Sequence, residues 1–402
     1  MARILVLDGH SGAALAAARA AGMAGHWVTV GANRGLFAAA KLSRYCRLGF
    51  DYPVSTEDTN AFVDSIVEFV RAHTIDLVIP VTDWTLGPIS QQRHRFAGLC
   101  RVAMPSQAAL DAVSDKYGTI RLAGSLGISV PRTMLAKSTE DLEKWETPQF
   151  PLVVKDRFSV RWIKGNAVFG SVAYAYSAED LRKLVAQRLQ LAGDVLIQEF
   201  VSGVGIGVSC FVAGEKTYLP FQWQRIREID PRGSGSSARK SIPLSPPLVS
   251  LSAKLITTMG FEGLAMVEYK KANDGRLILM EINGRPWGSI GLPIACGIDY
   301  FRHLIDWCLE EKLPPDVSSY RENIICRRAV AELTHLSALR TGRPANWPIP
   351  YPNFWTSLVA MSVPWHPGMC YDDVWLSDMR PGIAGITNWF QSRIKKKFLA
   401  RR

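Results

Sequence analysis

The 402 residues of this chain exceed what one ordinary hydrophobic core holds, so we expect two or three domains. With 48% hydrophobic and 21% charged residues, the composition is that of a globular protein and excludes an intrinsically disordered one. The formal net charge of +11 would suit a nucleic-acid partner, but more than half of this excess falls in residues 391–402. We therefore expect no nucleic-acid binding.

Seven cysteines are scattered along the chain, and no Cys-x-x-Cys pair occurs among them. This odd number without paired spacing predicts neither a disulfide framework nor a zinc site. The apolar run over residues 1–7 is too short for a signal peptide, and no later run reaches the length of a transmembrane helix. A cytoplasmic protein fits these observations best.

Short apolar runs and helical segments alternate along the first 110 residues. The expected elements are a strand over residues 3–8, a helix over 13–24, a strand over 27–30, an amphipathic helix over 58–73 and a buried strand over 75–81. This alternation predicts a small parallel α/β domain. The turn over residues 9–12 lacks the G-x-G-x-x-G spacing and no acid ends the second strand, so we interpret it as structural rather than as a dinucleotide site.

The middle of the chain continues with helices and strands of ordinary length. Helices are expected over residues 111–126, 177–191 and 246–259, and strands over 150–155, 195–201 and 208–212. Three glycines at positions 203, 205 and 207 precede the last of these strands. The polar, Gly- and Ser-rich stretch over residues 232–240 predicts a mobile loop.

Two apolar runs separated by Asp-Gly at residues 274–275 predict a β-hairpin with a two-residue turn. In that register Asn273 faces Arg276, and Glu268 lies directly opposite Glu281. Two carboxylates placed across from each other destabilise a sheet, so something must offset their repulsion. A hard divalent cation with oxygen ligands is the obvious candidate.

Asn283 follows Glu281 by two residues and therefore adds a third oxygen to the same face. Arg285 comes next, where a guanidinium could hold a phosphate or a carboxylate. The competing interpretation is a surface hairpin whose acids point into water. The flanking Met, Val, Leu and Ile residues favour the metal site, because they place the acids within an apolar ladder.

Two lysines are candidate phosphate ligands. Lys155 closes a strongly apolar strand, where a lysine is unusual unless its amine reaches a cleft. Lys116 opens a helix directly after Ser114 and Asp115. Lysines at the ends of elements are normally solvated, which is the alternative for each of them taken singly.

Together these residues resemble the ATP-grasp ligases. Residues 281–288, Glu-Ile-Asn-Gly-Arg-Pro-Trp-Gly, are similar to that family's metal-binding E-x-N-x-R strand, and Glu268 matches its first metal-binding acid. Lys116 and Lys155 match its two phosphate-contacting lysines. The segment similar to the hinge that binds adenine through its main chain consists of Gln198, Glu199, Phe200 and Val201. The resemblance covers about residues 1–310.

The resemblance implies a mixed fold of α/β and α+β type, in which a parallel α/β domain precedes a two-part ATP-grasp fold. The last strand of the N-terminal α/β domain, together with Thr82-Asp83, is expected to face the acceptor substrate. The expected divisions are a pre-ATP-grasp domain over residues 1–110, a small ATP-grasp subdomain over 111–195, a metal-binding subdomain over 196–315 and a Trp-rich C-terminal extension over 316–402.

One departure concerns the ribose of ATP. Many members of the family carry an acidic residue just after the hinge, which holds the ribose hydroxyls. Here residues 203–209 read Gly-Val-Gly-Ile-Gly-Val-Ser and contain no acid. The ribose contacts must come from elsewhere, and the glycines could instead let the main chain approach ATP closely.

The family's chemistry implies ATP and Mg²⁺ or Mn²⁺ as cofactors. A carboxylate is a poor electrophile, so it is first phosphorylated by the γ-phosphate of ATP. Metal ions held by Glu268, Glu281 and Asn283 would neutralise charge on the transferred group. Arg285 would stabilise the acyl-phosphate and the tetrahedral species that forms when the amine attacks. No nucleophilic triad is apparent in the sequence, and phosphoryl transfer needs none.

A basic stretch upstream of the hairpin is the candidate acceptor-side element. Arg225, Arg227 and Lys240 are expected to bind an anionic substrate or the intermediate, with Arg225, Lys240 and Arg285 as the candidate catalytic residues. A solvated basic loop is the equally weighted alternative for this stretch. The sequence does not identify the acid or the amine.

Tryptophans accumulate in the C-terminal extension, which ends in a basic tail. Aromatic residues beside lysines and arginines suit a membrane interface, and we hold peripheral membrane contact open for residues 386–402. For most of the extension we favour a small packed subdomain with a frayed, soluble tail.

These observations predict a ligase that joins a carboxylate to an amine through an acyl-phosphate and releases ADP and phosphate. One alternative is a catalytically silent nucleotide-binding protein that acts at a membrane surface. A biotin-carboxylase-like carboxylating enzyme is another, although no biotin-carrier segment occurs here. The expected partners are small-molecule carboxylate and amine substrates, with a homodimer left open.

Overall fold

The computed structural model describes residues 1–163, 166–316, 319–363 and 366–399. Its N-terminal part is a five-stranded parallel sheet in the order β3-β2-β1-β4-β5. The strands are β1 (Arg3–Val6), β2 (Trp27–Asn33), β3 (Cys46–Tyr52), β4 (Leu77–Ile79) and β5 (Arg101–Val102). The helices are α1 (Gly12–Met23), α2 (Thr59–His73) and α3 (Asp83–Gln91), with single 3₁₀ turns at η1 (Ala39–Leu42) and η2 (Arg93–Phe96).

Apolar residues on both faces of β1 explain why helices cover this sheet on two sides. Ile4 and Val6 are buried in a cluster with the alanines of α1, while Leu5 is buried on the opposite face with α2. Successive side chains of a strand point to opposite faces, so a run that is apolar throughout is covered on both. The parallel α/β opening expected from the sequence is confirmed.

Asp115 divides the segment that was expected to form one helix over residues 111–126. The structure has α4 (Gln107–Ser114) and α5 (Lys116–Ser125) instead, so that expectation is wrong. The Asp115 side chain accepts hydrogen bonds from the amides of Tyr117 and Gly118, both at 3.1 Å. An aspartate that caps a new helix in this way ends the preceding one.

A four-stranded antiparallel sheet in the order β10-β7-β11-β6 forms the second part. Its elements are β6 (Thr133–Ala136), the 3₁₀ turn η3 (Glu140–Lys144), β7 (Leu152–Asp156), β10 (Val172–Ala175), α6 (Ala178–Ala192) and β11 (Val195–Glu199). A separate hairpin of β8 (Val160–Ile163) and β9 (Asn166–Phe169) lies between β7 and β10 in the chain. Apolar residues of α6 and of this sheet share one core.

The largest sheet has seven strands in the order β16-β15-β12-β13-β14-β17-β18. They are β12 (Gly203–Ala213), β13 (Lys216–Glu228), β14 (Ser236–Ser241), β15 (Gly263–Ala272), β16 (Leu277–Asn283), β17 (Ile325–Arg327) and β18 (Met369–Tyr371), and α7 (Pro246–Thr258) precedes β15. The three glycines at positions 203, 205 and 207 lie within β12 rather than before it. In the chain, a parallel α/β domain is followed by predominantly antiparallel sheets, which confirms the expected mixed fold.

The stretch over residues 232–240 is only partly a loop. Residues 236–241 form β14, which pairs with β13 on one side and with β17 on the other. The loop predicted from the Gly- and Ser-rich composition is therefore wrong for these residues. They form a strand because β13 and β17 supply hydrogen-bond partners for their main chain, which the local composition does not indicate. A strand held between two others is not a mobile loop.

The C-terminal residues complete the large sheet and add helices beside it. These helices are α8 (Gly291–Cys296), α9 (Tyr300–Glu310), α10 (Ala329–Leu339), α11 (Phe354–Ser362) and α12 (Arg380–Leu399). Asp378, just before α12, accepts a hydrogen bond from Arg19 Nε of α1 at 2.9 Å, and both side chains are 1% exposed. This buried ion pair ties the end of the chain to the N-terminal domain.

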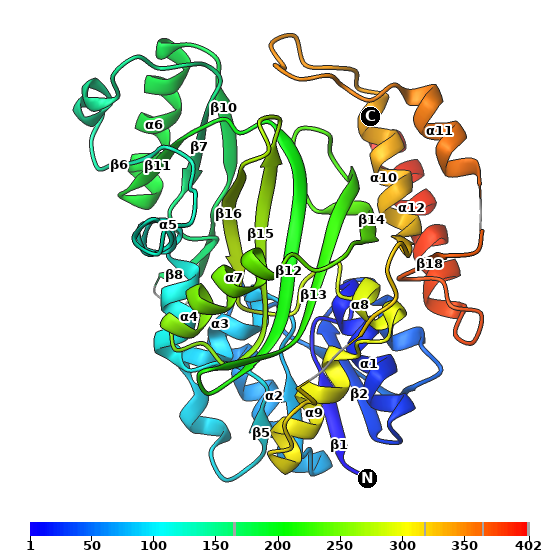
Figure 1. Ribbon diagram of the computed structural model, residues 1–402. Coiled ribbons are helices and arrows are strands. Elements are labelled where there is room, and N and C mark those ends of the chain that lie inside the picture. The colour runs from blue at the N-terminus through cyan, green and yellow to red at the C-terminus, as the bar shows by residue number, and fades with distance from the viewer. Residues whose placement is uncertain (164–165, 317–318, 364–365, 400–402) are drawn as a thin grey trace.

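Figure 1 shows the N-terminal sheet below the seven-stranded sheet, the four-stranded sheet at the upper left, and α10, α11 and α12 on the right. The β15–β16 hairpin lies on the side that faces the four-stranded sheet. Among the described residues, no helix has both the length and the apolar character needed to span a membrane.

Candidate active site

The β15–β16 hairpin places Glu268 directly opposite Glu281, as the sequence predicted. The turn, however, is not the expected one. The Ala272 amide donates to the Arg276 carbonyl at 2.9 Å, so Ala272 and not Asn273 faces Arg276. Three residues form the loop, and the last of them, Gly275, has a φ of +87°. That conformation at the third position is the usual one for a three-residue hairpin loop.

An irregularity in the strand pairing restores the register that the longer turn would have shifted. Tyr269 pairs with Leu279, whereas Glu268 pairs with Glu281, so Met280 is an extra residue on β16. A shift by one residue would have moved Glu281 to the opposite face of the sheet. The bulge at Met280 therefore keeps both carboxylates on one face.

Arg225 of β13 reaches Glu268 across β12. Its Nη2 lies 3.0 Å from Glu268 Oε2, and its Nη1 lies 3.0 Å from Glu228 Oε1. Burial raises the pKa of the Glu268 carboxyl to about 7, with Arg225 opposing this shift and Glu281 adding to it. A cation near both acids would favour their charged forms, as the electrostatic argument from the sequence required.

The glycines of β12 make room for this contact. A Cβ atom at Gly205 would lie 3.2 Å from Arg225 Nε, and one at Gly207 would lie 2.2 Å from the Trp223 indole. The two positions therefore accommodate side chains of β13 that lie over the sheet. This accounts for the glycine spacing by packing within the sheet, and Gly205 also lines one of the two cavities described below.

Both lysines face Glu281. Burial lowers the pKa of Lys155 to about 8 and also lowers the pKa of Lys116, and the largest opposing influence on each is the charge of Glu281. Lys155 is 8% exposed, and Lys116 Nζ donates to Ser159 Oγ at 2.8 Å. The structure thus brings two cations and the paired acids together from four separate elements, α5, β7, β15 and β16.

The hinge residues line a cavity of about 680 Å³, here called the hinge cavity. Its lining includes the four hinge residues, Lys155, Arg225, Glu268 and Lys270. Gln198 Nε2 donates to Thr133 Oγ1 at 2.8 Å, and the Val201 carbonyl accepts a hydrogen bond from Lys270 Nζ at 2.9 Å. These contacts join the hinge, at the end of β11, to β6 of the four-stranded sheet and to β15 of the large sheet.

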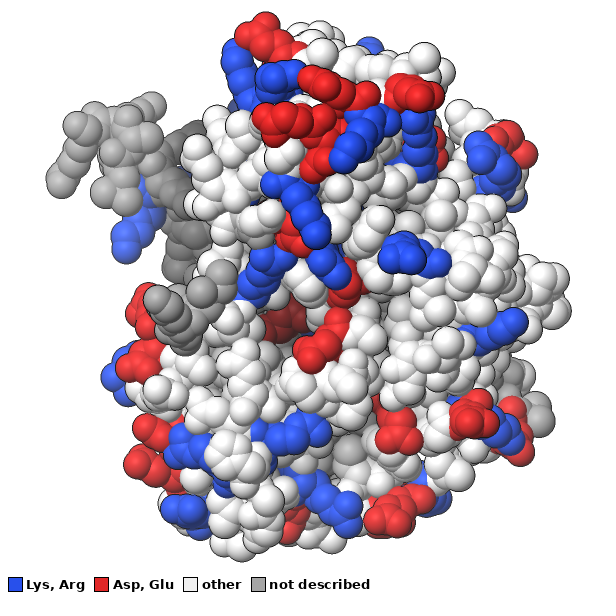
Figure 2. All heavy atoms as spheres, turned by 90° about the vertical axis from the view of Figure 1, so that its left-hand side faces the viewer, with Lys and Arg blue, Asp and Glu red and all other residues white. Residues whose placement is uncertain are grey.

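A second cavity of about 670 Å³, here called the Arg285 cavity, lies between α3, α4, α5 and the end of β16. Asp83, Lys116, Asn283 and Arg285 line it. Arg285 Nε lies 2.8 Å from Asp83 Oδ2, which joins the large sheet to the start of α3. Figure 2 shows a hollow on this side of the molecule, with acidic side chains inside it and basic side chains above.

Glu281 and Met280 line both cavities. The hinge cavity therefore meets the Arg285 cavity at the carboxylate that the sequence singled out. A group bound in one cavity and a group bound in the other can therefore both approach this residue.

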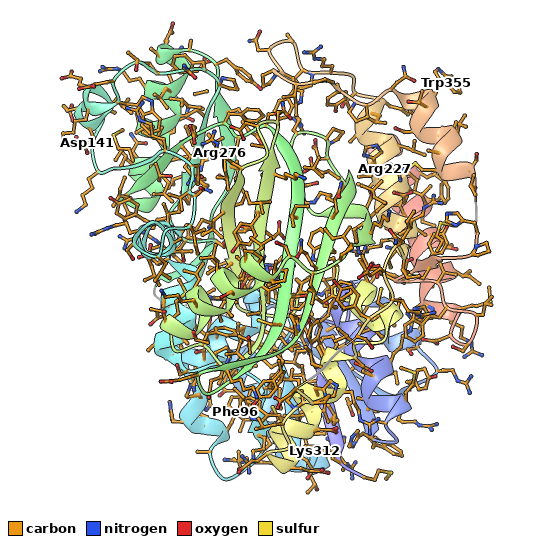
Figure 3. All side chains as sticks on the ribbon, viewed as in Figure 1. Phe96, Asp141, Arg227, Arg276, Lys312 and Trp355 are labelled. Atoms are coloured by element: carbon orange, nitrogen blue, oxygen red, sulfur yellow. The ribbon has the colours of Figure 1, made fainter. Side chains whose placement is uncertain are left out.

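The three basic residues of the expected acceptor cluster do not come together. Arg225 lines the hinge cavity rather than the Arg285 cavity, and Lys240 lines neither of them. Arg227 is held by Glu332 of α10, with two contacts of 2.6 and 2.7 Å, and Figure 3 shows it on the side of the sheet near that helix. Arg227 is therefore already paired with an acid of α10 and lines neither cavity, so its expected role toward a substrate stays a prediction.

The acids and the amide supply oxygen ligands for a metal ion. Within the described part of the chain, no group of three or more His, Cys, Asp or Glu side chains lies close enough to hold a metal by itself. Glu268, Glu281 and Asn283 provide hard oxygen donors, and Mg²⁺ is commonly held by one or two carboxylates completed by substrate phosphates. This donor set fits Mg²⁺ or Mn²⁺ bound together with a nucleotide.

Comparison with known proteins agrees with this geometry. Residues 192–331 match a family model described as ATP-grasp in the biosynthetic pathway with Ter operon. This span contains the hinge, Arg225, both acids, Asn283 and Arg285. This match places residues 192–331 of the chain in the ATP-grasp superfamily.

Relatives and solved structures extend the similarity of this ATP-grasp chain beyond the matched span. A probable alpha-L-glutamate ligase of Legionella pneumophila is 28% identical over 218 residues, which are 53% of this chain and 68% of the relative. An L-amino acid ligase from Bacillus licheniformis has a TM-score of 0.58 at 14% identity, covering 77% of this chain and 74% of that one. The biotin carboxylase domain of Hydrogenobacter thermophilus 2-oxoglutarate carboxylase, solved with MgADP, has a TM-score of 0.63 at 14% identity, covering 80% and 73%.

Two residues of this ATP-grasp site escaped the sequence prediction. Lys270 follows Glu268 by two positions, so the period of the strand was a usable signal for it. Trp347 lies far along the chain, and its ring packs 5.7 Å from Phe200 and 5.1 Å from Tyr174. Its neighbour Pro344 lines the hinge cavity, and nothing local in the sequence announces either residue.

Proposed function

We propose that this ATP-grasp ligase binds ATP in the hinge cavity and joins a carboxylate to the amine of an amino acid in the Arg285 cavity. The carboxylate takes the γ-phosphate of ATP to give an acyl-phosphate and ADP. The amine then attacks the acyl carbon, phosphate leaves, and the nitrogen loses a proton to solvent or product phosphate. The observation that carries this proposal is the position of Glu281 on the boundary of the two cavities.

The phosphates of ATP would lie between the two lysines and the paired acids. Lys155 and Lys116 are positioned to neutralise phosphate oxygens as point charges, with Lys116 opening α5 and Lys155 within β7. Mg²⁺ bound by Glu268, Glu281 and Asn283 would supply charge neutralisation on the transferred phosphoryl group. The protein's part is positioning and electrostatic stabilisation.

Arg285 would hold the acyl-phosphate on the acceptor side. Its guanidinium already carries an ion pair to Asp83, so its orientation is set before a substrate binds. A planar guanidinium suits carboxylate and phosphate oxygens better than an ammonium group does. Asp83 thus acts as a positioning residue for Arg285.

The class of the amine is inferred from relatives rather than from the cavity. The Legionella relative is named as a glutamate ligase, and one structural neighbour is named as an L-amino acid ligase. An α-amino acid is therefore the first class of amine to test.

A matrix of carboxylates and amino acids, assayed for phosphate release from ATP, tests the proposal directly. We expect release that requires both an acid and an amino acid, and a product whose mass equals the sum of the two minus water. Phosphate release driven by bicarbonate alone would instead indicate the carboxylating alternative. ATP binding without turnover across the matrix would contradict the ligase proposal and favour the catalytically silent one.

A further inference from the structure

The last helix, α12, presents an apolar stripe to solvent. Ile383, Phe390 and Ile394 are 54%, 50% and 55% exposed. At about 100° per residue these three positions fall within a sector of roughly 40° on one side of the helix. A stripe of this kind on a helix of 20 residues is an unpartnered face rather than a scatter of single exposed residues.

The side of α12 that lies about 100–120° from the centre of the stripe is packed against the rest of the protein, so the direction of the stripe is fixed. Trp389 Nε1 donates to Thr334 Oγ1 of α10 at 3.1 Å. A Cβ atom at Gly382 would lie 2.6 Å from Val374, which shows how closely the first turn of the helix packs. The Arg19–Asp378 ion pair anchors the residues just before the helix.

The charge around the stripe has one sign. Arg380 and Arg393 are exposed and fall on opposite flanks of the apolar sector, about 60–80° from its centre. From residue 379 to the end, the sequence contains no aspartate or glutamate. Its seven basic residues there are Arg380, Arg393, Lys395, Lys396, Lys397, Arg401 and Arg402.

We propose that α12 docks this ATP-grasp protein on the surface of an anionic lipid bilayer. The apolar stripe would enter the interface between headgroups and acyl chains, and Arg380, Arg393 and Lys395 would contact lipid phosphates. A helix with an apolar centre, basic flanks and no acid is complementary in charge to such a surface. The helix would lie on the membrane, which agrees with the finding that no described helix can span one.

Vesicle flotation of the full-length protein tests this proposal. We expect binding to vesicles of phosphatidylcholine mixed with phosphatidylglycerol, weaker binding to phosphatidylcholine alone, and release at high salt. The triple variant Ile383→Ser, Phe390→Ser, Ile394→Ser should lose at least about tenfold in vesicle affinity. The matched control replaces three exposed leucines elsewhere, Leu36, Leu191 and Leu313, by serine and should bind as the original protein does.

Three results would overturn the proposal. One is full binding of the α12 triple variant to anionic vesicles. Another is equal binding to both lipid compositions. The third is a concentration-dependent dimer that the triple variant abolishes while no vesicle binding occurs, since the stripe would then serve a second copy of the chain. Turnover of soluble substrates should be the same in all variants. A failure of the membrane-docking proposal can therefore be distinguished from a failure of the ligase proposal.

Discussion

The β15–β16 hairpin and the C-terminal extension over residues 316–402 contribute to the site in opposite ways. The hairpin carries its chemistry in consecutive, regularly spaced residues, so its function can be read locally. The extension acts through single side chains that reach distant elements, such as Trp347 at the hinge and Asp378 beneath α1. The difference teaches that the paired acids of the hairpin can be found from a local pattern, whereas Trp347 and Asp378 can be placed only once the fold is known.

The largest expected effect concerns the hairpin. Glu281→Gln removes a charge that both lysines face and that both cavities share, so turnover should fall by about a thousandfold or more with the fold unchanged. Phosphate release and thermal unfolding measure the two quantities. Glu179→Gln, an exposed change on α6, is the matched control. Full activity of Glu281→Gln would remove the metal from the mechanism.

The next effect concerns the extension. Asp378→Ala leaves the buried Arg19 guanidinium without its carboxylate, and we expect the free energy of unfolding to fall by about 3–5 kcal/mol. Urea unfolding at neutral pH measures this loss. Asp316→Ala, which breaks an exposed pair with Lys216, should lower the free energy of unfolding far less, because water screens this pair. Equal losses in the two variants would mean that the extension does not stabilise the N-terminal domain.

Raising the pH from 7 to 9 should weaken ATP binding, because Lys155 loses its charge. Because burial lowers the pKa of Lys155 to about 8, its amine is mostly charged at pH 7 and mostly neutral at pH 9. The ATP dissociation constant should therefore rise about tenfold between these values. Between pH 8 and the ordinary pKa of lysine, the unfolded chain binds more protons at this residue than the folded protein does. Lys155 therefore makes the free energy of unfolding increase as the pH rises through this range. Isothermal titration checks the binding, and Lys155→Met should show weak binding without this pH dependence.

The smallest effect tests whether the extension contributes to the nucleotide site. Trp347→Leu keeps an apolar side chain but removes two ring contacts, and the ATP dissociation constant should rise about fivefold. Trp355→Leu, at an exposed position on α11, is the control, and Figure 3 shows that side chain at the outer edge of the molecule. Unchanged ATP binding in Trp347→Leu would reduce this part of the extension to scaffold.

Alternation of apolar residues predicted the parallel α/β opening, and the spacing within the hairpin predicted the facing acids. The two-part ATP-grasp fold and the grouping of the two lysines with these acids followed instead from the resemblance to the ATP-grasp ligases. Its errors arose where tertiary partners decide. Residues 236–241 read as a loop until β13 and β17 hold them, and the helix break at Asp115 depends on a cap that competes with continuation of the helix. The Glu268–Glu281 pairing was predicted correctly with the wrong turn, since a bulge at Met280 compensates for one extra loop residue.

The roles assigned to the basic residues show the same limit. Arg225, Arg227 and Lys240 lie close in sequence, yet one reaches Glu268, one is held by Glu332 and one lines neither cavity. Alternation and irregular pairing along β13 and β14 separate them, and no spacing rule reveals which acid each will meet. Their catalytic roles therefore remain predictions, and Arg225 is the one whose position supports a role near ATP.

The Arg19–Asp378 ion pair also bears on how the protein is made. Arg19 is translated 359 residues before its partner, Asp378. Until Asp378 has been synthesised, the Arg19 guanidinium of α1 has no Asp378 carboxylate with which to form its ion pair. The Arg19 side chain can reach its final packing only after residue 378 has been synthesised, so a chain stalled before that residue leaves this guanidinium without its carboxylate.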